Sequence, residues 1–300
     1  MTLMLVDAAN LYFRAFYALP ESITAPDGRP VNAIRGFLDM SAALIERRRP
    51  TRWAACLDLD WRPAFRVQLV PSYKAHRMAK DGGEEIPPAL AAQLPPLLSL
   101  LGAFGLACAG ADGFEADDVI ATLAHRDSDP VEIVSGDRDL LALATDRVTV
   151  LYTGKGIAKL EAMGPAEVLA KYGVPAEHYA DFAVLRGDPS DGLPGVPGIG
   201  EKTAAALVSR FGPVEKIVQA ALAGDAGFPA GAAGKVRAAT DYLAVAPGAV
   251  RGRLDVPLDV IDDALYPEPR DAAELDRLAQ VLGVQNSVDR LRQAVSKASA

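Results

Sequence analysis

Short apolar runs alternate with longer amphipathic stretches in the first half of the chain. The runs at 3–6, 53–57 and 131–134 each end at or close to an aspartate, and residues 147–151 form a further apolar run. Runs of this length, separated by helical stretches, are typical of strands in a buried parallel sheet. The pattern therefore predicts a sheet built from right-handed βαβ units.

Periodic apolar positions predict the helices between these strands. Residues 33–48 and 115–126 carry amphipathic helical patterns, and residues 89–104 carry another with Pro95 and Pro96 inside it. Proline removes a backbone donor and clashes with the preceding turn, so we expect a break or kink there.

The pattern changes near residue 165, where the strand signal fades and short helices with Gly/Pro turns follow. We therefore divide the chain into an α/β region, 1–165, and a helical region, 166–300. Within the first region, residues 71–88 are polar, basic at first and bounded by prolines, which is typical of a functional loop. The helices expected in the second region cover residues 165–173, 177–187, 201–212 and 214–222.

Composition excludes several classes of protein. Half of the 300 residues are hydrophobic, so the chain is not disordered, and no apolar stretch is long enough for a membrane span. The N-terminus lacks the basic start of a signal peptide. Cys56 and Cys108 lie in apolar surroundings, which favours a reduced cytoplasmic protein without disulfides. The net charge of −8 argues against nucleic acid only if the acid is evenly spread.

The acid is not evenly spread, because it gathers where the apolar runs and helices begin or end. Ligands of parallel sheets bind outside the carboxyl ends of the strands, so we expect these carboxylates at one edge. Like charges packed together need a cation among them, and oxygen ligands without histidine or cysteine favour Mg²⁺ or Mn²⁺. The pattern predicts a two-metal phosphodiesterase. Its candidate ligands are Asp7, Asp58, Glu115, Asp117, Asp118, Asp137, Asp139, Asp188 and Asp191.

Each acidic cluster also has a plainer interpretation. Glu115, Asp117 and Asp118 begin a predicted helix, where one or two acids serve as caps. Asp137 and Asp139 follow a strand, as in many turns, and Asp7 after a first strand is common in α/β proteins. The coincidence of all the clusters at one sheet edge favours the metal site.

A second signal lies in residues 193–207, LPGVPGIGEKTAAAL. Gly195, Gly198 and Gly200 permit a tight hairpin with outward-facing amides, and a helix begins near Glu201, with Lys202 adding charge at its start. Free N–H groups at a helix start bind phosphate, and exposed carbonyls of the hairpin can hold a monovalent cation. The alternative is a helical connection without a ligand.

Basic residues are grouped in the polar loop. Tyr73, Lys74 and Arg77 combine a base-stacking ring with phosphate-pairing cations, although a solvated basic turn has the same composition. The run 47–49 is three arginines, which we interpret as a solvated helix end. The three histidines have no mutual metal spacing.

Over nearly its whole length the chain resembles the bacterial 5′-nuclease family: 5′-flap endonucleases and 5′→3′ exonucleases, which also form the N-terminal domain of DNA polymerase I. The resemblance is carried by LVDAANLYFRAFYAL, PDGRPVNAIRGF, FRVQLVPSYKAHR, GFEADDVIATLA, SGDRDLLAL and LRGDPSDGLPGVPGIGEKTAAALVSRFG. It implies a PIN-like α/β nuclease domain with a helical arch, joined to a helical region with a helix–three-turn–helix element.

The resemblance also implies roles for individual residues. Lys74, Arg77 and Arg14 would contact the scissile phosphate, and residues 71–95 would form the arch that admits a single-stranded 5′ end. One metal neighbourhood would comprise Asp7, Asp58, Glu115, Asp117 and Asp118, and the second Asp137, Asp139, Asp188 and Asp191. Duplex DNA and a K⁺ ion would be held by residues 193–203, with contacts from Tyr73, Gly195, Gly198, Gly200, Lys202 and Thr203.

Three positions depart from the family pattern. Ala8 and Gly192 replace the usual glycine and asparagine after the first and last acidic ligands. One extra residue before Phe65 leaves both Asp58 and Asp60 as candidate ligands, and we prefer Asp58 because it directly follows the apolar run.

We therefore expect a stand-alone, structure-specific 5′-nuclease that acts on branched or gapped DNA carrying a 5′ single strand. It would leave 5′-phosphate products, use two or more Mg²⁺ or Mn²⁺ ions, and work as a monomer in the bacterial cytoplasm, at the nucleoid during repair. Two rivals are a PIN-type ribonuclease and a non-catalytic binder of DNA junctions.

Overall fold

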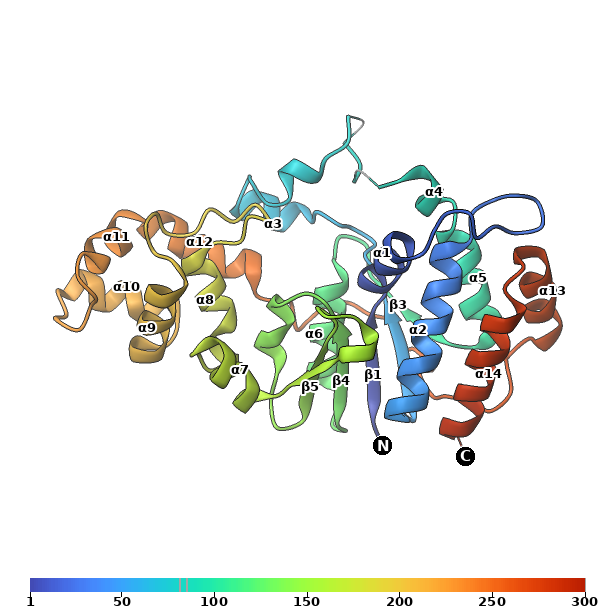
Figure 1. The fold of residues 1–300 in the computed structure, drawn as a ribbon. Coiled ribbons are helices and arrows are strands. Elements are labelled where there is room, and N and C mark those ends of the chain that lie inside the picture. Colours follow the sequence, from blue (N-terminus) through green and yellow to red (C-terminus); the bar gives the residue numbers. More distant parts are fainter. Residues whose placement is uncertain (81, 85, 300) are drawn as a thin grey trace.

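The computed structural model describes residues 1–80, 82–84 and 86–299, and a six-stranded sheet forms its centre (Figure 1). The strand order is β3-β2-β1-β4-β5-β6, and all neighbouring pairs are parallel except β5 and β6. The predicted parallel sheet is confirmed. Its strands are β1 (Leu3–Asp7), β2 (Arg52–Cys56), β3 (Ala107–Ala109), β4 (Val131–Ser135), β5 (Val148–Tyr152) and β6 (Glu161–Met163).

The register of the central strands brings their carboxyl ends together. Leu5 of β1 lies opposite Ala54 of β2 and Ile133 of β4. All of β1 is buried, as expected for a strand that is covered on both faces. Side chains that follow β1, β2 and β4 are thereby delivered to one edge of the sheet.

Helices cover both faces of the sheet. One face packs through Met4, Val6 and Trp53, and the other through Leu5 and Ile133. The first face is covered by α2 (Asn32–Arg48), α5 (Leu94–Phe104), α13 (Ala272–Leu282) and α14 (Gln285–Ser299). The second face is covered by α6 (Ala116–Arg126) and by a layer of short helices that follows β6, which we call the helical layer. In Figure 1, α13 and α14 lie beside α2 and α5, so they are separate from the helical layer that the sequence predicts for residues 166–300.

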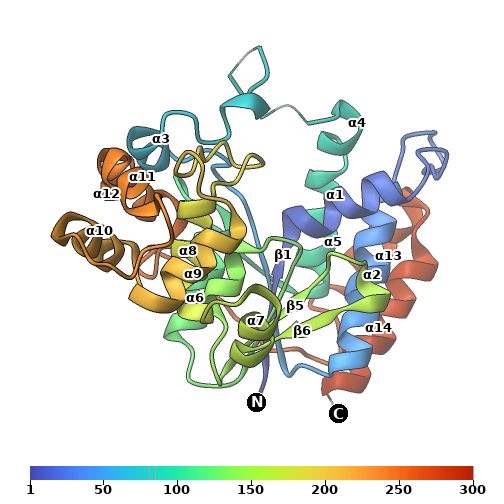
Figure 2. The same ribbon diagram turned by 60° about the vertical axis from the view of Figure 1, so that its left-hand side comes forward.

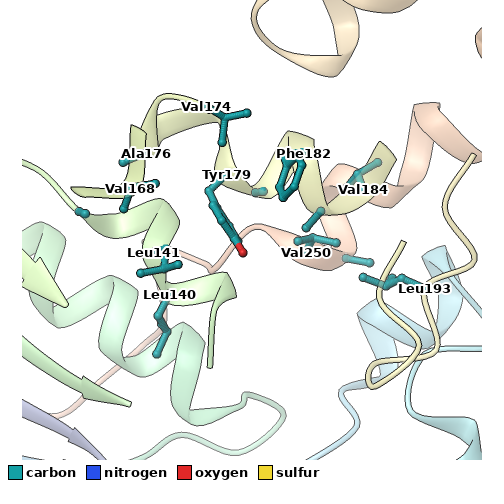
Figure 3. Packing of buried hydrophobic residues seen from close by; sticks show 14 of the residues in the cluster. Leu140, Leu141, Val168, Val174, Ala176, Tyr179, Phe182, Val184, Leu193 and Val250 are labelled. Carbon is teal, nitrogen blue, oxygen red and sulfur yellow. The ribbon is translucent and has the colours of Figure 1, made fainter. Parts of the chain in front are cut away.

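The helical layer continues the core instead of forming an isolated unit. Its members are α7 (Pro165–Tyr172), α8 (Tyr179–Arg186), α9 (Glu201–Phe211), α10 (Val214–Ala223), α11 (Ala232–Ala238) and α12 (Thr240–Val250). Figure 3 shows Tyr179 of α8 beside Leu141 of the 3-10 helix η2 (Asp139–Leu143), and the buried cluster to which both belong also contains Phe182 and Leu140. This packing joins the loop after β4 to the helical layer.

The predicted helical stretch over residues 89–104 is broken, as expected, but the break lies before Pro95 and Pro96 and not at them. The chain forms α4 (Pro88–Ala91) and then α5, and Pro95 and Pro96 lie in the first turn of α5, where no N–H is needed. Between the two helices, the buried side chain of Gln93 accepts hydrogen bonds from the backbone N–H groups of Ala33 and Ile34, at 2.9 and 3.3 Å.

The segment before α4 rises above the carboxyl ends of the strands, as Figures 1 and 2 show. It leaves α3 (Ala64–Leu69), forms the 3-10 turn η1 (Ala75–Arg77), and turns back through an antiparallel bridge between Met78 and Glu84. We call residues 71–95 the arch segment. No helix in the part of the chain that the structure describes has both the length and the apolar character to cross a bilayer.

Candidate active site

A cavity of about 620 Å³ opens at the carboxyl ends of the central strands, below the arch segment. Asp7, at the end of β1, caps α1 (Ala8–Ala18): its Oδ1 accepts from Asn10 N at 3.0 Å and its Oδ2 from Ser135 Oγ at 2.6 Å. The cavity is lined by the candidate ligands Asp7, Asp58, Glu115, Asp117 and Asp137, and by the cations Arg14, Lys74 and Arg77.

Asp58, and not Asp60, lines this cavity. The Asp58 carboxylate also accepts a hydrogen bond from Ala116 N at 2.6 Å, which ties the end of β2 to the start of α6. Asp60 instead accepts from Arg62 N at 3.1 Å within its own turn. The structure favours Asp58 as the ligand.

The cavity carboxylates repel one another. Burial, and then the charge of Asp58, raises the pKa of Asp7 to about 7. Burial raises the pKa of Asp117 well above its ordinary value, with further contributions from Asp137 and Asp7. Burial and Asp191 likewise raise the pKa of Asp137. From Asp58 to Asp191, each carboxylate therefore raises the pKa of a neighbouring carboxylate.

The donor set fits divalent cations. Burial and Asp137 raise the pKa of Asp139 well above its ordinary value, and its Oδ1 is buried without a hydrogen-bond partner among the described residues. A hard cation with oxygen ligands would relieve both conditions. In the described part of the chain, no three Asp, Glu, His or Cys side chains are already arranged to hold an ion. Two of the carboxylates, Glu115 and Asp191, instead pair with Lys74 and Arg77.

The acidic motif at the start of α6 serves two purposes. Glu115 and Asp118 form a capping box, as the plainer interpretation expects. Asp118 is fully buried behind the cavity, where its Oδ1 accepts from Arg66 Nη2 at 2.5 Å and from Arg253 N at 2.9 Å. Of these three acids, only Asp117 and Glu115 line the cavity. Asp118 instead connects the start of α6 to Arg66 and to the backbone of Arg253.

The second acidic group belongs to the loop after α8. Asp188 accepts hydrogen bonds from Ser190 N at 3.0 Å and from Arg186 Nη2 at 3.2 Å. Asp191 accepts from Arg77 Nη2 at 2.9 Å, and its backbone carbonyl accepts from Lys74 N at 2.9 Å. The base of the arch segment is therefore docked on the loop that carries these two acids.

The cavity cations are held by side chains and backbone. The Lys74 ammonium pairs with Glu115, and Lys74 itself adopts a left-handed conformation with φ 47°. Arg14 Nη2 donates to Thr153 Oγ1 at 3.2 Å, and its Nε is buried with no hydrogen-bond partner in the described part of the chain. Arg14 thus has donor capacity left for a ligand in the cavity.

The prediction that Tyr73 stacks on a DNA base is not supported. Tyr73 is 4% exposed, and its hydroxyl donates to Glu115 Oε2 at 2.7 Å. Its ring lies 5.7 Å from the guanidinium carbon of Arg66. The side chain is thus part of the support beneath Lys74.

Gly192 occupies a position that no larger residue fits. Its φ is 69°, and a Cβ there would lie 2.1 Å from the carbonyl oxygen of Ser72. The Ser72 hydroxyl donates to Gly192 O at 2.7 Å, which closes the contact between the arch base and the acidic loop. The family's asparagine at this position would require a different approach of the two segments.

We therefore expect Gly192→Asn to separate the arch base from the acidic loop. Asparagine tolerates positive φ, so the effect comes from the clash with Ser72 and should lower stability by about 1–3 kcal/mol. Thermal melting measures this loss. As a control, Gly113→Asn also changes a glycine at positive φ, but with nothing near its Cβ. Equal effects of the two substitutions would contradict the close-approach argument.

The loop after α8 contains a tight turn within the predicted segment, where Ile199 N donates to Val196 O at 2.9 Å. A Cβ on Gly195 would lie 2.6 Å from Gly187 N, so this loop passes directly against the backbone at the end of α8. Gly200 is the N-cap of α9, and Lys202 in its first turn is exposed while Thr203 is half-buried. This end of α9 presents free N–H groups and a cation to solvent.

The carbonyl of Gly198 already has a cationic partner. Lys235 Nζ of α11 donates to Gly198 O at 2.8 Å. The resemblance assigns a K⁺ ion to residues 193–203 as a whole. At the carbonyl of Gly198, this ammonium already supplies a positive charge in place of such an ion.

Several supporting residues escape the sequence analysis. Arg66 is 2% exposed and contacts both Glu115 and Asp118. Arg62 Nε donates to the carbonyl of Tyr73 at 2.6 Å, and Thr153 Oγ1 donates to Asn10 Oδ1 at 2.9 Å. In the sequence, only the position of Arg62 and Arg66 beside the basic residues of the arch segment suggests that they support the site. Contacts with residues far away along the chain produce no periodic pattern that could be recognised.

Comparison with known proteins places the chain among nucleases. Two family models match consecutive parts of it: the 5′-3′ exonuclease N-terminal resolvase-like domain over residues 2–173, and the 5′-3′ exonuclease C-terminal SAM fold over residues 174–273. A 5′-3′ exonuclease of Mycobacterium tuberculosis is 50% identical over 98% of this chain and 97% of its own length. A DNA polymerase I of Mycobacterium bovis is 41% identical over 99% of the chain, which spans 32% of that longer protein.

Solved structures share the fold at lower identity. A flap endonuclease from bacteriophage T5, in complex with DNA and metal ions, superposes with a TM-score of 0.65 at 20% identity, over 100% of this chain and 99% of that one. The catalytic core of Rad2 with a DNA substrate gives 0.60 at 16% identity, over 98% and 91%. The predicted PIN-like fold with a C-terminal helical region is confirmed.

Proposed function

The chain belongs to the 5′-3′ exonuclease family and is a structure-specific 5′-nuclease of DNA, and we propose that its carboxylate cavity is the centre where the phosphodiester is hydrolysed. The observation that carries this proposal is the juxtaposition of mutually repelling carboxylates with Lys74, Arg77 and Arg14 in one cavity. Such a mixture of acids and cations suits a metal-assisted reaction on a phosphate.

We assign the divalent ions, Mg²⁺ or Mn²⁺, to two groups of carboxylates. Asp7, Asp58, Asp117 and the cavity face of Glu115 would serve one ion, and Asp137, Asp139, Asp188 and Asp191 the other. When bound, such ions supply a more acidic water and neutralise charge on the leaving 3′-oxygen. Asp118 is left out of the ligand set because its oxygens are engaged by Arg66, Arg253 and Glu115.

The chain's own cations orient the phosphate. Lys74 and Arg77 of the arch segment and Arg14 of α1 line the same cavity. Preorganised cations at the position where charge develops stabilise the transition state more than the ground state. Glu115 and Asp191 hold Lys74 and Arg77 in this structure. An ammonium has three N–H donors and a guanidinium has five, so both cations would keep these carboxylates and turn their remaining donors to the phosphate.

The substrate is proposed to be branched or gapped DNA with a single-stranded 5′ end. The arch segment above the cavity would receive the single strand, and the hairpin of residues 193–203 would hold the duplex backbone by the first turn of α9. The protein would act as a monomer at the bacterial nucleoid. A PIN-type ribonuclease would share the cavity but would not need this hairpin.

A 5′-flap duplex labelled at either end tests the proposal, incubated with Mg²⁺ or Mn²⁺ and with a chelated control. Metal-dependent cuts near the flap junction, with 5′-phosphate products, are the expected result. The same assay with an RNA strand distinguishes this nuclease from a PIN-type ribonuclease, which would cleave the RNA. Binding of the duplex without cleavage at any metal concentration would overturn the nuclease assignment and favour a junction binder.

Duplex binding is expected to be indifferent to the choice between K⁺ and Na⁺. Lys235 supplies the cation at Gly198, so fluorescence anisotropy in KCl and NaCl at equal ionic strength should give the same dissociation constant for the wild-type protein. Lys235→Met should weaken binding in NaCl by about tenfold, the size of one charged hydrogen bond, and KCl should restore part of the loss. Tighter wild-type binding in KCl than in NaCl would contradict the assignment.

A further inference from the structure

Arg66 on α3 is the most enclosed cation of the described chain, and it lies behind the cavity, not in it. It is 2% exposed, and its guanidinium carbon lies 5.1 Å from the Phe65 ring and 5.7 Å from the Tyr73 ring. A buried charge is costly unless opposite charges and hydrogen bonds compensate it. Among the described residues, Arg66 Nε has no hydrogen-bond partner, so its compensation is the charge of a nearby carboxylate. Its contacts therefore identify what the residue holds in place.

The guanidinium joins three segments that are distant in the sequence. Nε lies 2.8 Å from Glu115 Oε2, and Nη2 donates to Asp118 Oδ1 at 2.5 Å, both at the start of α6. Nη1 donates to the carbonyl of Ala249 at 2.6 Å. Ala249 belongs to the last turn of α12, where carbonyls have no partner within the helix and attract cations.

Glu115 connects Arg66 to Lys74, because its carboxylate contacts both side chains. Glu115 Oε2, which faces Arg66, also accepts the Tyr73 hydroxyl at 2.7 Å, and Glu115 Oε1 receives the Lys74 ammonium. Arg66 and Tyr73 together fix the rotamer of Glu115, and Glu115 fixes the head of Lys74. On the other side, α12 packs against α8, the helix that leads into the glycine hairpin.

We propose that Arg66 is a positioning residue that aligns Lys74 for the reaction and couples this alignment to the docking of α12, through the bridge Ala249–Arg66–Glu115–Lys74. The inference rests on the proposed function, because it assigns Lys74 to the phosphate. It predicts that Arg66 influences the chemical step and not the affinity for DNA. It also predicts that this influence passes through Lys74.

The test is a double-mutant cycle on the full chain, read by single-turnover cleavage of a 5′-flap duplex and by DNA anisotropy in chelator. Arg66→Lys keeps the charge but loses the planar fork, and should lower the single-turnover rate by about 100-fold, as misplacement of a catalytic group by an ångström does. The DNA dissociation constant should change by less than about threefold, since no hairpin contact is altered. In a Lys74→Ala background, the same substitution should lower the rate by less than about threefold.

Arg52→Lys is the matched control. Arg52 also bridges two carboxylates, with Asp263 at 2.8 Å and Asp127 at 2.7 Å, but it lies at the amino end of β2. Its replacement should lower the thermal midpoint without a rate defect at temperatures well below melting. Tyr73→Phe, which removes one hydroxyl from Glu115, supplies a second test if Arg66→Lys folds poorly; its rate should also fall, again only when Lys74 is present.

The outcomes separate the inference from the proposed function. Wild-type cleavage that depends on Lys74 but not on Arg66 or the Tyr73 hydroxyl would overturn the inference alone. Equal rate losses from Arg66→Lys with and without Lys74 would also overturn it, because Arg66 would then act independently of Lys74. Absence of metal-dependent cleavage by the wild-type protein would overturn the proposed function itself.

Discussion

Replacing Asp117 with asparagine is expected to abolish metal-dependent cleavage while raising the thermal midpoint of the metal-free protein. Among the residues that the structure describes, none donates a hydrogen bond to this carboxylate, and burial, Asp137 and Asp7 all disfavour its charge. A neutral isostere relieves that repulsion. The substitution also removes a metal ligand. A bound metal stabilises the transition state by several kcal/mol, so its loss corresponds to a rate decrease of about 10³-fold or more.

The pH dependence of the stability gain follows from the direction of the pKa shift. Because the folded state raises the pKa of Asp117 above its ordinary 3.8, the folded protein binds more protons than the unfolded chain once the pH exceeds that value. Stability without metal therefore falls as pH rises, and Asp117→Asn should remove part of this fall. The midpoint gain should be present at pH 8 and vanish near pH 4 in differential scanning calorimetry.

Asp118→Asn is the informative comparison, because the residue is adjacent but faces the other way. Asp118 pairs with the buried Arg66, and removal of one partner from such a pair costs about 3–5 kcal/mol. We expect a lower midpoint for this variant at pH 8, where Asp117→Asn gains. Near-wild-type cleavage by Asp117→Asn, or a loss of stability equal to that of Asp118→Asn, would remove Asp117 from the metal site.

The parts of the fold that depend on local pattern are predictable from the sequence. The runs that form β1, β2, β4 and β5 are mostly apolar because both faces of these strands are covered. The edge strands β3 and β6 have three residues each, too few for a pattern to emerge. The return of α13 and α14 to the sheet is also invisible, because an amphipathic helix does not encode which apolar surface it covers.

In the candidate site, too, some features can be predicted from the local sequence and others depend on distant residues. The acids after β1, β2 and β4 are predictable because parallel strands deliver their ends to one edge, and most of the candidate ligands line one cavity. The orientation of Asp118 and the burial of Tyr73 are not predictable, since Asp118 pairs with Arg66 and Tyr73 with Glu115, and each of these partners is distant in the sequence. The ammonium at Gly198 depends likewise on α11, which carries Lys235.

Removal of the Lys74 ammonium is expected to lower single-turnover cleavage by about 10²–10³-fold, the usual cost of losing one preorganised donor to a developing oxyanion. The backbone of Lys74 is held in place at the base of the arch segment. Its backbone is held in the left-handed region at φ 47°, and its N–H donates to the Asp191 carbonyl at 2.9 Å. Lys74→Met retains the aliphatic stem and should show the full defect, with DNA binding in chelator reduced by less than about threefold.

A matched lysine distinguishes this role from simple charge loss. Lys171 also pairs with a carboxylate, Glu161, and its ammonium lies 5.6 Å from the Tyr172 ring, as Lys74 lies 5.2 Å from Tyr73. Lys171→Met should cleave at the wild-type rate, because α7 does not border the cavity. Lys74→Arg should recover little activity, since a planar guanidinium cannot occupy the place of an ammonium held by Glu115 and braced by Arg66. Recovery to the wild-type rate would show that charge alone, and not the position set by Glu115, is what the reaction needs.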